Sequence, residues 1–469
     1  TNFYAVYSRT LTVSYNGNSA TSGSTAATTK TIYLNSNSTT TSSQAITLAN
    51  NGFARTGYTY SKWAAGSTSG TQVSAGASYT PGVAYDATTF GTTMYAIWNA
   101  NSYTVNYYTY DGKTKLGSSS HTYNSAKALT TMATLKGTAP NSSVTFYGWA
   151  TSANSTSRTY TDGQSVNNLT ATNGGTINLY AIYRSAAVTI TYKSGLNSAT
   201  TSTSSTVYYY NAATSVSITT GTPAAISNWT AQGWRADTTA GAKTYSSNTA
   251  TNFSASATLY GVYTRSYTAS FYSGVNKATT KTVASSTVYY NSSAAATPTQ
   301  TTVVIPSADN TTAITNWTKL GYRADTNAQA QAYAFGETKT VNFGTNFYAV
   351  YSRTLTVSYN GNGSTSGSTA STTKTVYLNT NSTTTSSQAI TLANNGFART
   401  GYTYSKWAAG STSGTQYAAG ASYTPGIAYD ATTFGTTIYA VWSANTYTIG
   451  YTLNGGTKGT NGPTSGAYD

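Results

Sequence analysis

Residues 95–98 read Tyr-Ala-Ile-Trp, and similar short aromatic segments divide the whole chain. They return at intervals of roughly 80 to 90 residues, which is typical of a tandem array of small units. The other copies are residues 4–7 (Tyr-Ala-Val-Tyr), 180–183 (Tyr-Ala-Ile-Tyr), 260–263 (Tyr-Gly-Val-Tyr), 348–351 (Tyr-Ala-Val-Tyr) and 439–442 (Tyr-Ala-Val-Trp). Aromatic and β-branched residues favour strands, so we expect each segment to be the strand that closes a unit.

An opening segment follows each closing segment after a few residues. It alternates apolar and polar side chains, as in residues 11–15 (Leu-Thr-Val-Ser-Tyr), 103–107 (Tyr-Thr-Val-Asn-Tyr) and 188–192 (Val-Thr-Ile-Thr-Tyr). A period of two predicts a half-buried strand. Helical periodicity is weak, and residues 43–49 with their later copy are expected to form a helical turn or two at most.

Two more elements recur inside each unit. An aromatic segment ends at an asparagine, at positions Asn35, Asn124, Asn211 and Asn291. A further strand is expected near a glycine and an aromatic residue, as in Gly148-Trp149, Gly233-Trp234 and Gly321-Tyr322, because glycine permits a turn or a close backbone approach.

Residues 9–98 and 353–442 align without a gap at an offset of 344 and differ at ten positions. Four differences are swaps of similar apolar volume, which a packed interior tolerates, so we expect core positions at Ile32/Val376, Val83/Ile427, Met94/Ile438 and Ile97/Val441. Three more divergent units lie between the two copies. The predicted division is residues 1–8 (closing strand of a preceding repeat), 9–100 (repeat 1), 101–185 (repeat 2), 186–266 (repeat 3), 267–353 (repeat 4), 354–444 (repeat 5) and 445–469 (opening strand of a following repeat).

The aromatic residues supply the interior of these units. The chain has 44 Tyr, 11 Phe and 8 Trp, and only 7% of its residues are charged, a composition that favours many short strands over disorder. We expect the repeat cores to contain Tyr58, Trp63, Tyr95, Trp98, Trp149, Tyr180, Trp234, Tyr260, Tyr322, Tyr348, Tyr402, Trp407, Tyr439 and Trp442.

Composition also excludes several classes of function. The net charge of +15 comes from 24 basic residues spread singly along the chain, whereas nucleic-acid binding proteins concentrate them on one face. Nine acidic residues, one histidine and no cysteine are too few for most active sites or metal sites. We therefore expect no enzyme activity, no cofactor and no nucleic-acid partner. No apolar run approaches the length that spans a membrane.

Several of these segments resemble the internalin-type B repeat, also called the Listeria-Bacteroides repeat. The resemblance rests on residues 10–17 (Thr-Leu-Thr-Val-Ser-Tyr-Asn-Gly), 55–60 (Arg-Thr-Gly-Tyr-Thr-Tyr), 94–98 (Met-Tyr-Ala-Ile-Trp) and 447–457 (Tyr-Thr-Ile-Gly-Tyr-Thr-Leu-Asn-Gly-Gly-Thr), together with Trp63. It covers 9–98, 353–442 and the segment from 445, while repeats 2 to 4 keep only the closing segment and the glycine-aromatic pair.

The resemblance implies small β-grasp-like modules in tandem on a bacterial or archaeal surface protein, acting as stalk, spacer or interaction domains, with no catalytic residues. These units are longer than the family module, so extra loops or an elaborated sheet are expected. Lys62 and Lys406 stand where the family usually has glycine before tryptophan.

One candidate chemistry is a self-formed bond between a lysine and an asparagine, which would reinforce a unit that lacks disulfides. It requires a buried acid beside the lysine, because a charged amine is a poor nucleophile. The pairs to test are Lys30 with Asp86 and Lys374 with Asp430, against the simpler interpretation that all four are solvated ions. Arg235 with Asp237, and Arg323 with Asp325, are two residues apart and are expected to form surface ion pairs.

The connectors between units are only a few residues long, so we expect a mainly β protein whose modules are joined into a rod. The expected function is a structural extracellular repeat protein that forms a cell-surface stalk or filament and has adjacent repeats as its main partners. The alternative is an adhesin that binds sugars or host proteins through exposed aromatic side chains. Lateral bundling with other copies, and attraction to cell-wall polymers or surface glycans, also stay open.

Overall fold

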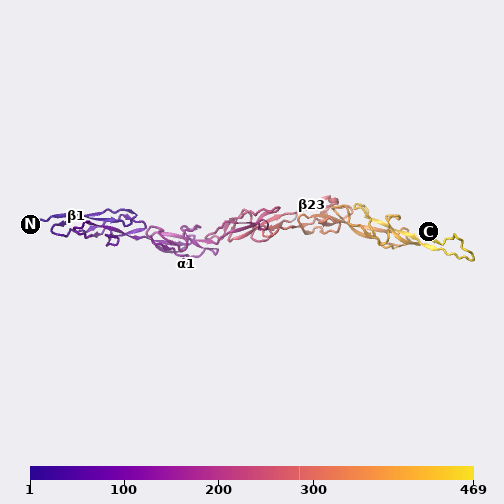
Figure 1. The fold of residues 1–469 in the computed structure, drawn as a ribbon, viewed down its shortest axis with the longest axis horizontal. Coiled ribbons are helices and arrows are strands. Elements are labelled where there is room, and N and C mark those ends of the chain that lie inside the picture. The colour runs from indigo at the N-terminus through magenta and orange to yellow at the C-terminus, as the bar shows by residue number, and fades with distance from the viewer. Residues whose placement is uncertain (285) are drawn as a thin grey trace. The chain divides into compact units, whose positions relative to one another are not determined.

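The computed structural model describes residues 1–284 and 286–469 and divides into two compact units. The first contains residues 1–191, 203–219 and 250–257, and the second contains residues 192–202, 220–249 and 258–469. Strands make up 46% of the chain and helices 3%. Short strands follow one another from the first residues to the last, and helical turns such as α1 are brief (Figure 1). The prediction of a mainly β chain with little helix is confirmed.

Repeat 1, in the first unit, is built on a five-stranded sheet of order β3-β1-β9-β6-β7. Strand β1 (Val6–Asn16) pairs antiparallel with β3 (Thr28–Asn35) and parallel with β9 (Gly91–Ala100). β9 then pairs antiparallel with β6 (Tyr58–Ala65), and β6 with β7 (Gln72–Val73). The long strands that begin and end the repeat therefore lie side by side and parallel, an arrangement that fits the expected β-grasp-like module.

In repeats 2 and 3 the opening strand again lies beside the closing strand. In repeat 2 the order is β11-β10-β15-β13, with strands at Lys115–Thr122, Ser102–Tyr108, Thr176–Ser185 and Val144–Ala150, and β10 and β15 are parallel. In repeat 3 the order is β17-β16-β21-β19, with strands at Thr200–Thr203, Ile190–Ser194, Ala257–Arg265 and Thr230–Arg235. β24 (Val288–Asn291) of repeat 4 also pairs with β21.

Repeats 4 and 5, in the second unit, share one eight-stranded sheet. Its main path is β23-β22-β28-β36-β33-β34, and β26 and β30 both pair with β28. In that order, the six strands of the path are Thr279–Ala284, Thr268–Ser273, Asn346–Asn360, Gly435–Ala444, Tyr402–Ala409 and Gln416–Tyr417, and the other two are Thr318–Arg323 and Thr372–Asn379.

Small two-stranded sheets and short helical turns complete the units. The pairs are β2–β5 (Ser22–Gly23, Phe53–Ala54), β4–β8 (Ile46–Thr47, Ser78–Tyr79), β12–β14 (Lys127–Ala128, Ser165–Val166), β18–β20 (Val216–Thr219, Ala250–Phe253), β25–β27 (Gln300–Val304, Thr338–Asn342), β29–β32 (Ser366–Gly367, Phe397–Ala398), β31–β35 (Ile390–Thr391, Ser422–Tyr423) and β37–β38 (Thr446–Thr448, Ser465–Ala467). The helical segments are α1 (Met132–Leu135) and three 3₁₀ turns at Leu196–Ser198, Val275–Lys277 and Ala308–Asn310. No helix in the described residues is long and apolar enough to cross a membrane.

The predicted alternation of the opening strands is confirmed by their burial. Leu11 and Val13 of β1 are buried, as are Tyr103, Val105 and Tyr107 of β10. Alternate side chains of a strand point to opposite faces, so each opening strand covers a core with one face only.

One large aromatic side chain fills the centre of each repeat. Trp63, Trp149, Trp234, Tyr322 and Trp407 are the equivalent residues, and each is at most 1% exposed. The other nine aromatic residues of the expected cores are half-buried. In repeat 1, Trp63 packs with Val13, Ile46, Leu48 and Met94, so the core lies between the main sheet and the β4 segment.

The central tryptophan also forms a hydrogen bond to the segment that covers the sheet, which in repeat 1 is the segment around β4. Trp63 Nε1 donates to Ala49 O at 2.9 Å, and Trp407 Nε1 donates to Ala393 O at 2.9 Å. Trp234 Nε1 donates to Gly221 O at 2.7 Å. The tryptophan nitrogen therefore adds a partly buried hydrogen bond that holds this segment against the sheet.

The glycine beside this aromatic residue is needed in repeats 2 to 4. Gly233 and Gly321 have φ of +144° and +152°, and a Cβ on either would lie 2.3 Å from the carbonyl oxygen of the bridged residue, Tyr245 O or Tyr333 O. The ladder register shifts at both glycines. In repeats 1 and 5 the register of the ladder shifts just before Lys62 and Lys406. Neither lysine has a positive φ.

Two sequence expectations need adjustment. Of the four swapped apolar positions, Ile32/Val376 and Met94/Ile438 are buried, whereas Val83/Ile427 and Ile97/Val441 are half-buried. Residues 43–49 form no helical turn, because they contain β4, whose Ile46 pairs with Tyr79 and turns into the core.

The tryptophan hydrogen bond can be tested inside the chain. Trp63→Phe removes the donor and leaves the Ala49 carbonyl unpaired, which should cost about 1–3 kcal/mol beyond the change in packing. Trp149→Phe is the matched control, because Trp149 Nε1 is buried and has no hydrogen-bond partner among the described residues. Hydrogen exchange in increasing urea measures the free energy of unfolding of each sheet. Equal losses in the two variants would contradict the assigned role of the bond.

Candidate functional site at the junctions between repeats

The lysine and aspartate pairs that were candidates for an isopeptide bond are not assembled for that reaction. Lys30 is half-buried and its Nζ donates to Ala45 O at 2.6 Å, while Asp86 is exposed. Lys374 donates to Ala389 O in the same way, and Asp430 is also exposed. Neither pair is among the ion pairs of the described residues. The geometry gives no support to this prediction.

The remaining ionisable groups are dispersed. Within residues 1–284 and 286–469 no three His, Cys, Asp or Glu side chains come close enough to hold a metal ion. His121 is buried in repeat 2, where it stacks on Tyr103 and its Nε2 lies 2.9 Å from Ser119 Oγ. Burial, with a smaller contribution from Lys127, lowers the pKa of His121, which favours the neutral ring of a packing residue.

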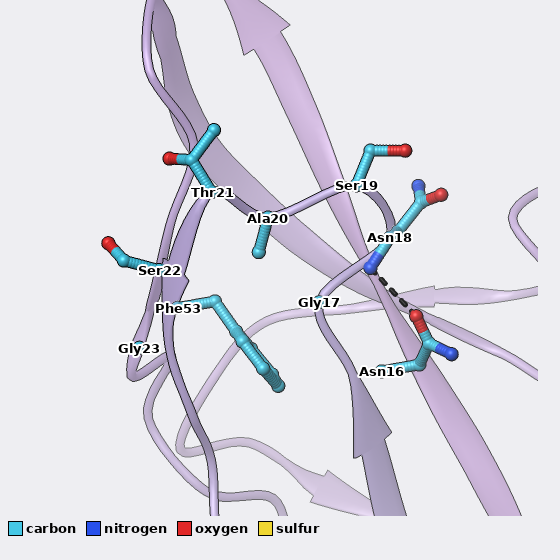
Figure 2. A pocket seen from close by; sticks show the side chains of 9 residues that line it. All are labelled: Asn16, Gly17, Asn18, Ser19, Ala20, Thr21, Ser22, Gly23 and Phe53. Carbon is cyan, nitrogen blue, oxygen red and sulfur yellow. Dashed lines mark hydrogen bonds between the residues drawn. The ribbon is translucent and has the colours of Figure 1, made fainter.

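A shallow hollow in repeat 1 has no chemically reactive lining. Figure 2 shows the loop of residues 16–23 curling around Phe53, with Asn18 N donating to Asn16 Oδ1 at 2.8 Å. Trp98 Nε1 fixes the loop by donating to Gly17 O at 2.9 Å. The lining contains only Asn, Gly, Ser, Ala, Thr and Phe, without an acid, a base or a histidine. The loop is therefore a structural turn.

Continuous backbone pairing distinguishes the junction between repeats 4 and 5. The predicted boundary after residue 353 falls within β28, which runs without interruption from Asn346 to Asn360. Its first part pairs with β22 and β26 of repeat 4, and its second part pairs with β30 and β36 of repeat 5. The closing strand of one repeat is thus the opening strand of the next, and no linker separates them.

A buried asparagine fastens this junction from the side. Asn379, at the end of β30, is 1% exposed, and its Nδ2 donates to Asp325 O at 3.2 Å and Asn327 O at 3.1 Å. Both acceptors belong to the loop that follows β26 in repeat 4. The next residue, Thr380, donates its hydroxyl to Gly274 O and accepts from Lys277 N at 2.9 Å. Repeat 5 therefore forms hydrogen bonds to two separate loops of repeat 4.

The predicted ion pair lies in the loop after β26 and holds the conformation of that loop. Arg323 Nε and Nη2 each lie 2.7 Å from a different oxygen of Asp325, and Arg323 Nη1 donates to Ala330 O at 2.7 Å. The hydrogen bond from Arg323 holds the pKa of the Asp325 carboxyl below its ordinary value. The surface ion pair is confirmed, and its backbone neighbours serve as the acceptors of Asn379.

The same arrangement joins repeats 3 and 4. Asn291 Nδ2 donates to Asp237 O and Thr239 O, both at 3.0 Å, and Arg235 binds both carboxylate oxygens of Asp237. Ser292 then donates to Lys193 O at 2.7 Å. At the junction of repeats 2 and 3 a reduced form remains, in which Asn211 Nδ2 donates to Ser155 O at 3.2 Å and Asn211 N to Tyr183 O at 2.9 Å.

Buried tyrosine hydroxyls hold each closing strand to loops of its own repeat. Tyr351 OH donates to Thr312 O at 2.7 Å and accepts from Gly274 N at 2.9 Å. Tyr263 OH makes the equivalent pair of bonds in repeat 3. Burial raises the pKa of Tyr351 to about 12 and also raises that of Tyr263, so both hydroxyls stay protonated donors at neutral pH.

A second kind of junction follows repeats 1 and 5. Asn101 N donates to Gly57 O at 2.9 Å, and the Tyr123 ring packs edge-on against Tyr58 at 5.8 Å. Gly57 has φ +78°, and a Cβ there would lie 2.2 Å from the Tyr123 ring, so only glycine fits. The same contacts recur after repeat 5. Asn445 N donates to Gly401 O, and the rings of Tyr402 and Tyr468 pack edge-on with centroids 5.6 Å apart.

The sequence analysis identified the asparagines and the Arg-Ala-Asp triplets but did not predict that the asparagine side chain binds the backbone beside the triplet. Their constant spacing could have indicated this contact. The acceptor and the asparagine lie 54 positions apart in both cases, Asp237 with Asn291 and Asp325 with Asn379.

The chain gave no match in a scan against models of protein families, nor in a search of curated proteins. The resemblance to the internalin-type B repeat stays a prediction.

The asparagine contact can be measured against an internal control. Asn379→Ala removes two hydrogen bonds from a buried amide to backbone carbonyls of the repeat 4 loop and should destabilise the β28 sheet by about 1–3 kcal/mol. Asn35 is the same residue in the first copy, but it is exposed and makes only the local turn bond to Asn37 N that Asn379 also makes to Asn381 N.

Asn35→Ala should therefore change stability by less than about 0.5 kcal/mol. Urea-dependent hydrogen exchange of strands β1 and β28 compares the two variants. A similar loss in both strands would show that Nδ2 of Asn379 contributes nothing across the junction.

Proposed function

We propose that this chain is a structural extracellular repeat protein that bears tension along its length as part of a cell-surface stalk or filament. The observation that carries the proposal is the parallel pairing of the strands that begin and end a repeat. β1 pairs with β9 from Thr12↔Gly91 to Asn16↔Tyr95, and β28 pairs with β36 from Thr356↔Gly435 to Asn360↔Tyr439. β10 with β15 and β22 with β28 are parallel as well.

This pairing determines how a repeat responds to a pull at its two ends. Tension drags the first strand and the last strand in opposite directions along their own axes. The hydrogen bonds between parallel strands are evenly spaced across the pair, so they are loaded together in shear. An antiparallel hairpin pulled at its open end instead loses its bonds one at a time.

The junctions suit the same role, because they pass force from strand to strand. β28 carries tension from repeat 4 into repeat 5 without a flexible linker, and the asparagine contacts hold the neighbouring loops in place. No disulfide is available to reinforce a chain without cysteine, so noncovalent shear resistance would have to supply its strength.

Ring burial disfavours the adhesin alternative, which needs an aromatic patch repeated on each unit. Among the described residues, the exposed aromatic side chains gather in two places. They are Phe3, Tyr4, Tyr7, Tyr33 and Tyr85 in the first hundred residues, and Tyr447, Tyr451 and Tyr468 near residue 469. In the described part of the intervening repeats, the large apolar side chains that are exposed are Leu196 and Val304. The proposed surface location rests on the sequence resemblance alone.

Single-molecule stretching tests the proposal directly, since cysteine handles can be placed at will. The chain held at residues 1 and 469 loads its repeats in shear, whereas handles at Val6 and Asn35, which face each other across the β1–β3 hairpin, unzip antiparallel bonds. We expect a clearly higher unfolding force for the first geometry. A force equal to or below that of unzipping would rule out the load-bearing role.

A further inference from the structure

Repeat 1 has an uncovered apolar face at the start of its sheet. Tyr7, Tyr33 and Tyr85 line it and are 60%, 54% and 41% exposed, and Leu34 and Phe90 form its floor. These residues come from β1, β3 and the segment before β9. Contiguous exposed aromatic side chains of this kind usually mark an interaction surface.

Repeat 5 carries the same face in a covered state. Residues 1–18 are identical to residues 345–362, and Tyr7, Leu34, Tyr85 and Phe90 correspond to Tyr351, Leu378, Tyr429 and Phe434 at the offset of 344. Tyr351 and Leu378 are both 0% exposed, and Tyr429 is half-buried. The part of repeat 4 that precedes β28 covers them.

Trp317 of repeat 4 makes the principal contacts. Its ring packs edge-on against Phe434 with centroids 5.6 Å apart, and its Nε1 donates to Tyr429 O at 2.8 Å. Ile314 joins the same apolar cluster, which also contains Leu355, Val376 and Leu378. A buried tryptophan whose ring packs against apolar side chains while its nitrogen donates a hydrogen bond is a typical anchor of an interface.

The uncovered face already has the conformation of the covered one. Arg9 lies over the Phe90 ring at 4.8 Å and donates to Ala87 O at 2.7 Å and Thr88 O at 3.0 Å. Arg353 lies over Phe434 at the same 4.8 Å and donates to Ala431 O at 2.6 Å and Thr432 O at 2.8 Å. Because the face is preorganised, docking would require little ordering of side chains.

We propose that the Tyr7–Leu34–Tyr85–Phe90 face of repeat 1 is a docking face for a repeat of the kind formed by residues 267–353, which inserts its Trp317 side chain against Phe90. Repeat 3 is a poorer match, because its equivalent Trp229 packs on Tyr290, where repeat 5 has Leu378. The inference rests on the proposed function, since it assigns a specific neighbour within a load-bearing array.

The test uses the whole chain with one addition. Residues 267–344 are placed before Thr1, which reproduces the sequence of the junction between repeats 4 and 5. A second version carries Trp317→Ala in the added copy only. Hydroxyl-radical labelling followed by mass spectrometry reports the exposure of each tyrosine, with Tyr447 and Tyr468 as internal references that should not change.

We expect the added repeat to abolish labelling of Tyr7 and reduce that of Tyr33 and Tyr85, and the Trp317→Ala version to restore much of it. Unchanged labelling with the intact added repeat would overturn the docking face, while the shear resistance of the individual repeats, and with it the proposed function, would stand. Protection of Tyr7 in the original chain, together with a doubled mass in solution, would assign the face to a second copy and would also overturn the proposal.

Discussion

In repeats 4 and 5, one strand of fifteen residues belongs to two modules at once, and the structure of both modules depends on it. β28 is paired along both edges, first within one repeat and then within the next. Because backbone groups inside a sheet need partners, this strand cannot bend freely between the modules without losing ladder bonds. Relative placement of the two repeats is therefore set by backbone hydrogen bonding, and side chains only refine it.

Side-chain contacts at the junctions follow from this geometry. The end of the second strand of a repeat comes close to the loop after the third strand of the repeat before it, where backbone carbonyls are left without ladder partners. An asparagine amide can satisfy two such carbonyls at once, as Asn291 and Asn379 do. The Arg235–Asp237 and Arg323–Asp325 pairs hold the acceptor loops in shape, which gives exposed ions a structural role beyond their small Coulomb energy.

Local periodicity was enough to predict the strands, and internal comparison was enough to predict the repeats. Leu11 and Val13 alternate with polar residues, and their burial depends only on that alternation. The central tryptophans could be found in the same way. The buried face of the closing strands was harder to predict. The large side chains of Tyr95 and Trp98 suggested that they fill the core, but the buried residues on that strand are Met94 and Ala96. A one-residue difference in register decides which side chains face the core.

Contacts between distant segments were outside the reach of sequence reasoning. Nothing local separates Asn35, which is exposed, from Asn379, which is buried, since the difference lies in what precedes each repeat in space. Likewise Lys30 and Asp86 are a reasonable pair in sequence, but the Lys30 amine lies on the Ala45 carbonyl.

Hydrogen exchange at the junction amides tests the central claim most directly. Lys277 N and Thr380 N donate across the contact between repeats 4 and 5, to Thr380 O and Ala349 O, both at 2.9 Å. If the junction is a continuous part of the sheet, these amides should exchange only when β28 itself unfolds, with the same protection as the interior of that strand. Exchange at the rate of exposed loops, with β28 still protected, would mean that the repeats are separate modules joined by loose contacts.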